Sequence, residues 1–230
     1  MKKTVCKTSR LCRELFPKSE LVQTYTLQKG LYITMKILIA TNNKGKLMEF
    51  NKILSELSIE CVSLSDMKIN ANVPETEDTF LGNARLKAKE IYKIAKMPVI
   101  SDDSGLLTDA LDGRPGVLSA RFSGENSDDN KNIEKLLFEL RDVPDDKRTA
   151  RFKSVVYFVY DDNTEIYAEG SCEGVILHEK RGNNGFGYDP VFYVKEFEKT
   201  FAELTNEEKN SISHRGRAIM ALKSRLNEVR

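Results

Sequence analysis

Long apolar runs are missing from this sequence. No apolar stretch in the 230-residue chain approaches the roughly 20 consecutive residues that a helix needs to cross a bilayer. Hydrophobic residues make up 40% of the chain and charged residues 31%, the balance of a globular protein in water. The composition therefore indicates no membrane role, and the length allows one substantial core or two lobes of one domain.

Cysteine is also scarce. Cys6, Cys12, Cys61 and Cys172 are scattered, without CxxC spacing and without a convincing secretory leader. This usage predicts free thiols in a reducing compartment, hence a cytoplasmic protein, and it argues against a zinc site.

The sequence also lacks an excess of basic residues outside its first 34 positions. Residues 1–34 hold seven Lys and Arg against two Glu, a net charge of +5, so the rest of a chain with net charge +1 carries −4. A protein that binds nucleic acid through its surface charge needs the opposite balance. Any anion that the body binds must therefore be met by individually placed residues.

Residues 1–34 show no clear hydrophobic period, and the first convincing strand opens at Met35. We treat 1–34 as an N-terminal extension of unknown role and expect one domain over 35–230. The extension is basic and poor in acids, which weakly resembles a transit peptide, although a misassigned start or an added leader is the simpler interpretation.

The most informative segment is Asp102-Asp103-Ser104-Gly105, which follows the short apolar run 99–101. The pattern predicts that a buried strand ends here, where open α/β folds place ligands, and that Gly105 allows a sharp turn. Two adjacent carboxylates would repel each other unless a cation neutralised them, and such hard oxygen ligands suit Mg²⁺.

The sequence contains three other Asp-Asp pairs, and each is explained by an ordinary turn, linker or helix cap. They are predicted to be a helix start at Asp128-Asp129, a linker at Asp145-Asp146, and a hairpin turn at Asp161-Asp162. Turn or cap chemistry therefore remains an alternative for Asp102-Asp103.

A polar loop lies between a predicted strand over 36–40 and a predicted helix over 47–57. Backbone N–H groups, the positive end of a helix and an ammonium group can converge there on a phosphate. The loop is not a Walker A motif, and a plain strand-to-helix turn is the alternative. Its residues are Thr41, Asn42, Asn43, Lys44, Gly45 and Lys46.

An acidic loop over 70–78, which contains Glu75, precedes a long predicted helix over 79–96. Asn83 and Lys87 are four residues apart and share one face of that helix. This arrangement can bring the carboxylate of Glu75, the Lys87 amine and Asp103 to one cleft, although a surface position is the default for such a lysine.

The second half is predicted to be mostly antiparallel and to form a separate lobe. An amphipathic helix is expected over 127–141, a long hairpin over 149–161 and 164–174, and two further strands over 175–178 and 191–194. The glycine-rich loop between those strands allows close backbone approach to a ligand, and Phe186 offers a stacking face. A glycine-rich hairpin with a core Phe is the alternative.

The C-terminal region predicts two helix starts, a capping box over 205–208 and an N-cap at Ser213. Lys209, His214 and Arg215 lie at this junction, where they can offer hydrogen-bond donors to a phosphate or a carbonyl oxygen.

Residues 35–230 closely resemble the inosine triphosphate pyrophosphatase family, the XTP/dITP diphosphatases. The motifs that carry the resemblance are ATNNKGK, ETEDTFLGNARLKA, ISDDSGL, LDGRPGVLSARFSG, GFGYDPVF and FAELTNEEKNSISHRG. They follow one another in order along the chain, and only 1–34 is unmatched.

The resemblance implies an elongated α/β fold with a twisted mixed sheet flanked by helices, and two lobes with a nucleotide cleft between them. It also implies a homodimer that hydrolyses ITP, dITP and XTP to the monophosphate and pyrophosphate with Mg²⁺. Asp103 is then the proton acceptor for the attacking water, and Glu75 and Asp103 bind Mg²⁺; Pro74 stands where relatives often have a second acid.

The resemblance also assigns the substrate contacts. Lys87, Ser104, Lys209 and Arg215 match phosphate or substrate ligands, and the loop 41–46 matches the phosphate site. Phe186, Gly187, Tyr188 and Asp189, with His214 and Arg215, match the base pocket.

Two alternatives stay open. One is a house-cleaning pyrophosphatase of the Maf type that acts on pyrimidine or modified nucleotides, and the other is a nucleotide-binding module without turnover.

A 6-keto purine would accept hydrogen bonds from the region of His214 and Arg215, whereas the 6-amino group of adenine would leave buried donors unpaired.

Overall fold

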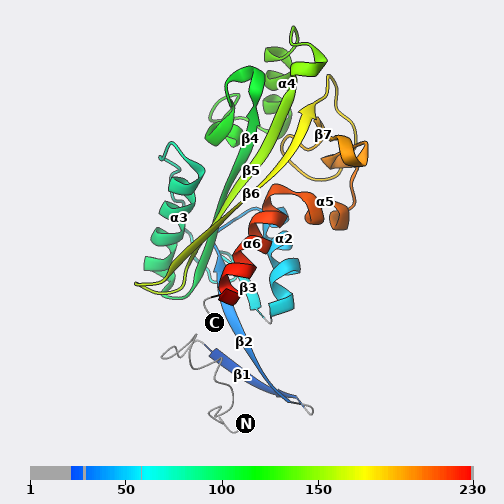
Figure 1. The fold of residues 1–230 in the computed structure, drawn as a ribbon. Coiled ribbons are helices and arrows are strands. Elements are labelled where there is room, and N and C mark those ends of the chain that lie inside the picture. Colours follow the sequence, from blue (N-terminus) through cyan, green and yellow to red (C-terminus); the bar gives the residue numbers. More distant parts are fainter. Residues whose placement is uncertain (1–21, 28–29, 58, 229–230) are drawn as a thin grey trace.

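The computed structural model describes residues 22–27, 30–57 and 59–228 (Figure 1). Within these ranges the strands form one eight-stranded mixed sheet in the order β1-β2-β4-β5-β6-β7-β8, with β3 also paired to β2. The strands are β1 (Val22–Leu27), β2 (Gly30–Ile39), β3 (Ile59–Ser63), β4 (Val99–Thr108), β5 (Thr149–Val159), β6 (Glu165–Ile176), β7 (Phe192–Val194) and β8 (Lys199–Thr200). The α-helices are α2 (Lys44–Leu54), α3 (Phe80–Ala95), α4 (Asp129–Glu139), α5 (Asn206–Ile212) and α6 (His214–Glu228).

Helices cover both faces of the long strands β4, β5 and β6. One core cluster lies between the sheet and α2 with α6, and includes Phe50 and Ile219; a second lies between the opposite face and α3, and includes Ala84 and Ile91. The third cluster fills the other end of the molecule, under α4 and β7 (Figure 1). The predicted mixed α/β class is confirmed, and the two lobes share the hydrogen-bonded strands β4, β5 and β6.

Local signals place the helices close to their predicted bounds. The Thr79 hydroxyl caps α3 by accepting from the Gly82 N–H, and Thr205 and Glu208 form the predicted capping box of α5. The Ser213 hydroxyl accepts from the Gly216 N–H at the start of α6. None of the helices in the described ranges has the length and apolar character to cross a bilayer.

The first strand begins earlier than predicted. β2 starts at Gly30 instead of Met35, and residues 22–27 pair with its first half as an antiparallel hairpin. Part of the segment treated as an extension therefore lies on the sheet.

The prediction that the strand ends before Asp102 is wrong. β4 continues through Asp102-Asp103-Ser104-Gly105 to Thr108, because each of its residues pairs with β5 in antiparallel register. Gly105 makes no turn; a Cβ there would lie 2.3 Å from the Gly116 carbonyl oxygen and 2.5 Å from Ser119 Oγ. Glycine is needed because another segment packs against the strand at this point.

Candidate active site

The candidate site lies where β2 stops and β4 continues. The two strands are parallel and pair only at Leu38 with Val99 and at Ile39 with Ile100. Beyond Ile39 the chain leaves the sheet for α2, so the edge of β4 from residue 101 onward is free of its parallel neighbour. This is the carboxyl end of a parallel pair, which the sequence predicted as the place of the site.

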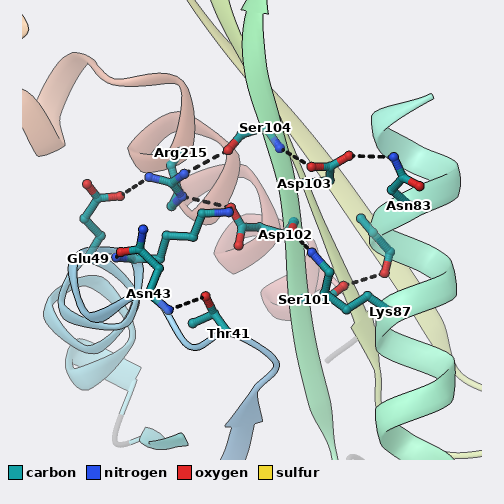
Figure 2. Close-up of polar contacts among 12 residues, drawn as sticks. Thr41, Asn43, Glu49, Asn83, Lys87, Ser101, Asp102, Asp103, Ser104 and Arg215 are labelled. Atoms are coloured by element: carbon teal, nitrogen blue, oxygen red, sulfur yellow. Dashed lines mark hydrogen bonds and ion pairs between the residues drawn. The ribbon is translucent and has the colours of Figure 1, made fainter. Parts of the chain in front are cut away.

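Asp102 and Asp103 point to opposite faces of the sheet, because successive side chains alternate along a strand (Figure 2). Asp102 faces α2 and α6, and Asp103 faces α3. The prediction that the two carboxylates form one pair neutralised by a cation is therefore wrong, and each must be considered with its own partners.

Asp102 is neutralised by the protein itself. Its Oδ2 lies 3.0 Å from Lys46 Nζ and accepts a hydrogen bond of 3.0 Å from Arg215 Nε. Burial favours the neutral acid, but the charges of Lys46, Arg215 and Lys87 outweigh it and hold the pKa of Asp102 well below its ordinary value. Asp102 is thus a permanent anion that fixes two cations in the site.

Arg215 links three elements through its guanidinium. Besides Asp102, it donates from Nη1 to Glu49 Oε2 on α2 at 2.6 Å and from Nη2 to Ser104 Oγ on β4 at 2.9 Å. Burial lowers the pKa of Arg215, but Asp102 and Glu49 more than reverse this, so the net shift is upward and the group stays charged. Glu49 was missed by the sequence motifs, although it lies three residues after Lys46 on the same helix face.

Asp103 has a different environment on the α3 face. Its Oδ2 accepts from Asn83 Nδ2 at 3.0 Å and its Oδ1 from the Ser104 N–H at 2.9 Å. Burial and the nearby carboxylate of Glu75 raise the pKa of Asp103 to about 6, although Lys87 and Asn83 oppose the shift. Such a carboxylate is ionised at neutral pH yet is a stronger base than an ordinary Asp.

Glu75 is brought to the same place by two cations. Lys87 Nζ donates to Glu75 Oε1 at 2.5 Å and to the Asp102 carbonyl at 3.2 Å. Arg121 Nη2 donates to the Glu75 carbonyl at 3.2 Å. The predicted meeting of a carboxylate, an amine and Asp103 is therefore present, and Arg121 is an additional member that the motifs did not reveal.

The loop 41–46, predicted to bind phosphate, reaches Asp102 through Lys46. Asn43 is the N-cap of α2, and its Oδ1 accepts from the Lys46 N–H, while its own N–H donates to Thr41 Oγ1. Gly45 lies against Phe186, where a Cβ would be 3.2 Å from the ring. Asn42 and Lys44 are exposed, so within this loop Lys46 is the residue that the structure brings to Asp102.

The predicted base-pocket residues fall into two groups. The Phe186 ring lies 4.9 Å from Lys209 Nζ and 5.7 Å from Arg215 Cζ, and Lys209 donates to Asp189 Oδ2 at 2.6 Å. Burial raises the pKa of Asp189, and Lys209 opposes that shift. Phe186, with Lys209 and Asp189, therefore lies close to Arg215 and its partners.

Tyr188 and Gly187 are engaged elsewhere. The Tyr188 side chain is buried in the core, and its hydroxyl donates to the Ser119 carbonyl at 2.8 Å. The Gly187 N–H donates to Asp129 Oδ2 at 2.7 Å. The Tyr188 side chain therefore does not join the predicted pocket.

His214 is buried at the start of α6, with its ring stacked on Phe152 at 4.7 Å between centroids. Its Nδ1 is one of the buried side-chain atoms without a hydrogen-bond partner among the described residues. Burial, followed by the charges of Arg215 and Lys209, lowers the pKa of His214 well below 6.5. The ring is therefore neutral at physiological pH.

This lowered pKa predicts a pH-dependent stability. The unfolded chain takes up the proton near pH 6.5 and the folded chain only at lower pH, so the free energy of unfolding falls as the pH drops below about 6.5. We expect the free energy of unfolding, measured with urea, to fall between pH 7.5 and pH 5.5 by about 1 kcal/mol more in the wild type than in His214→Phe. The phenylalanine keeps the ring stack but cannot titrate. Equal losses in both proteins would contradict a buried neutral His214.

The donor set suits a hard divalent cation only in part. Among the described residues no group of three or more His, Cys, Asp or Glu side chains is close enough to hold a metal ion alone. Glu75 and Asp103 supply two carboxylates on one face, so a bound cation would take further oxygen ligands from a phosphate. Such a pair fits Mg²⁺ shared with a phosphorylated substrate.

A cavity of about 620 Å³ lies elsewhere, between the start of α3 and the segment 112–118. Its lining includes Phe80, Leu107, Val117 and Leu118 and contains none of the predicted site residues. The charged cluster at the end of β2, and not this cavity, therefore has the chemistry of a candidate site.

The fold and the cluster together define an α/β protein with lysine, arginine and carboxylate groups gathered at the carboxyl end of its parallel strands, a set that suits an anionic, phosphorylated ligand. A family model described as the Ham1 family matches residues 37–225, so the chain belongs to the Ham1 family, which confirms the resemblance seen in the motifs.

Curated relatives cover nearly the same region. A dITP/XTP pyrophosphatase of Bacillus cereus is 48% identical over 195 residues, which are 84% of this chain and 95% of that protein. One of Halalkalibacterium halodurans is 50% identical over 185 residues, 80% of this chain and 95% of that protein. The structure of the Staphylococcus aureus Ham1 protein is similar with a TM-score of 0.76 and 41% identity, and covers 85% of this chain and 100% of its own.

Proposed function

We infer that this chain is a nucleoside triphosphate pyrophosphatase that hydrolyses the deaminated purine nucleotides dITP, ITP and XTP to the monophosphate and pyrophosphate. Two findings support this function: the chain belongs to the Ham1 family, and relatives that match 80% or more of the chain are named dITP/XTP pyrophosphatases. The observation in the molecule that carries it is the pair of carboxyl groups of Asp103 and Glu75 beside the partly buried amines of Lys46 and Lys87. Hydrolysis of a phosphoanhydride needs such positioning and charge neutralisation more than covalent chemistry.

In the proposed mechanism, Asp103 accepts the proton of the attacking water as the bond between the α and β phosphates breaks. Lys46, Lys87 and the N-terminus of α2 hold the phosphate oxygens, which carry more negative charge as pyrophosphate leaves. Glu75 and Asp103 are proposed to hold Mg²⁺, which when bound supplies further charge neutralisation.

Base selection is proposed to rest on Phe186, Lys209 and His214, which lie close to Arg215. The Phe186 ring offers a stacking face, and a neutral His214 with an unpartnered Nδ1 can meet the keto edge of hypoxanthine or xanthine. The 6-amino group of adenine would leave a buried donor facing another donor, which is costly.

We further propose that residues 35–230 form the catalytic domain of a cytoplasmic homodimer. Light scattering at several concentrations tests the dimer, and a mass that stays at the 26.1 kDa of one chain would contradict it.

Pyrophosphate release with Mg²⁺ from dITP, ITP, XTP, ATP, GTP and dTTP in parallel tests the function. We expect rapid release from the first three and slow release from the others, with all of it lost when Mg²⁺ is chelated. Preference for dTTP would move the protein to the Maf type, and tight nucleotide binding without release would make it a binding module.

A further inference from the structure

Asn83 lies in the first turn of α3 and was not among the predicted site residues. The residue is 1% exposed, and both ends of its side-chain amide form hydrogen bonds. Nδ2 donates to Asp103 Oδ2 at 3.0 Å, and Oδ1 accepts from the Glu77 N–H at 2.9 Å. One amide thus holds the carboxylate of Asp103 and the loop that carries Glu75.

Lys87 lies one turn after Asn83 on α3 and plays a similar part for Glu75 (Figure 2). Residues four apart share a helix face, and Lys87 holds the side chain of Glu75 from the face on which Asn83 holds Asp103. The helix is fixed on the sheet by buried residues that include Ala84 and Ala88. One packed helix therefore holds both Asp103 and Glu75, and Arg121 adds a second contact to Glu75.

We propose that Asn83 is a positioning residue that presents Asp103 and the Glu75 loop to the divalent cation, an inference that rests on the proposed function. An amide suits this role because it carries a donor and an acceptor on one rigid plane. Asp at this position would still accept from the Glu77 N–H, but it would face Asp103 with a second negative charge instead of a donor.

The test compares Asn83→Leu and Asn83→Asp with Ser101→Ala as a matched control. Ser101 is fully buried and also ties β4 to α3, through a hydrogen bond to the Ala84 carbonyl, but it contacts neither Asp103 nor Glu75. Two quantities are measured: the affinity for Mn²⁺ without substrate, from the electron paramagnetic resonance signal of free Mn²⁺, and kcat/KM for dITP with Mg²⁺.

Asn83→Leu should lower both the Mn²⁺ affinity and kcat/KM by about 10- to 100-fold. Asn83→Asp should lower kcat/KM by a similar factor but keep Mn²⁺ binding, because the new carboxylate is itself a hard oxygen ligand. Ser101→Ala should match the wild type in both. Asn83→Asp keeps the bond to the loop, so it remains informative if Asn83→Leu does not fold.

Wild-type Mn²⁺ affinity and turnover in Asn83→Asp and Asn83→Leu, or equal losses in Ser101→Ala, would overturn the positioning role. The Mn²⁺ measurement needs no turnover. Failure of the wild type to hydrolyse dITP would therefore contradict the proposed function, while the Mn²⁺ affinity of Asn83→Leu relative to the wild type still decides the role of Asn83.

Discussion

Asp103→Asn is expected to lower kcat for dITP and XTP by about 10²- to 10⁴-fold while the protein stays folded. Asp103 is a buried residue, 5% exposed, and its carboxylate receives hydrogen bonds from Asn83 and from the Ser104 N–H. Its pKa of about 6 makes it an ionised and comparatively strong base at neutral pH. An amide of the same size removes the charge on which both the proposed proton transfer and the proposed cation binding depend.

The control is Asp146→Asn, which makes the same chemical change at an exposed position far along the chain. Steady-state turnover is measured for both variants after circular dichroism and urea unfolding have shown that they fold. Asp146→Asn should behave as the wild type. Turnover near the wild-type rate in Asp103→Asn would show that another group accepts the proton.

The helices were predictable because their signals are local. Thr79 caps α3 three residues before the N–H that it satisfies, and the capping box of α5 lies within four residues. The length of β4 was not predictable in this way. Its polar centre at Asp102-Asp103 looks like a strand end, and only the pairing with β5, about 50 residues later, shows that the strand continues.

The same limit applies to the site. The motifs pointed to the loops and helices that meet in the candidate site, but the partners of each charge depend on contacts between distant elements. Arg215 reaches Asp102 across more than a hundred residues, so the sequence could not show that Asp102 is already neutralised. Glu49 and Asn83 carried only a weak signal, since each shares a helix face with a predicted lysine.

Lys46→Met is expected to lower kcat/KM for dITP by about 10²- to 10³-fold. The Lys46 ammonium lies 3.0 Å from Asp102 in the first turn of α2, where N–H groups and the helix dipole already favour an anion. Burial lowers the pKa of Lys46, and Asp102 opposes that shift, so the carboxylate helps to keep the amine charged for the proposed contact with phosphate. Methionine matches the aliphatic part of the lysine side chain and removes the charged amine with its hydrogen-bond donors.

The fold should survive this change, because Arg215 still donates to Asp102. Lys44→Met is the matched comparison: it removes the same charge from the same helix turn, but Lys44 is exposed. If Lys46 acts as a placed ligand, the loss in kcat/KM should be large for Lys46→Met and small for Lys44→Met at 0.15 M salt. Equal losses that shrink together as salt is raised would mean that the loop attracts the nucleotide through its overall charge, since screening weakens exposed charges far more than buried ones.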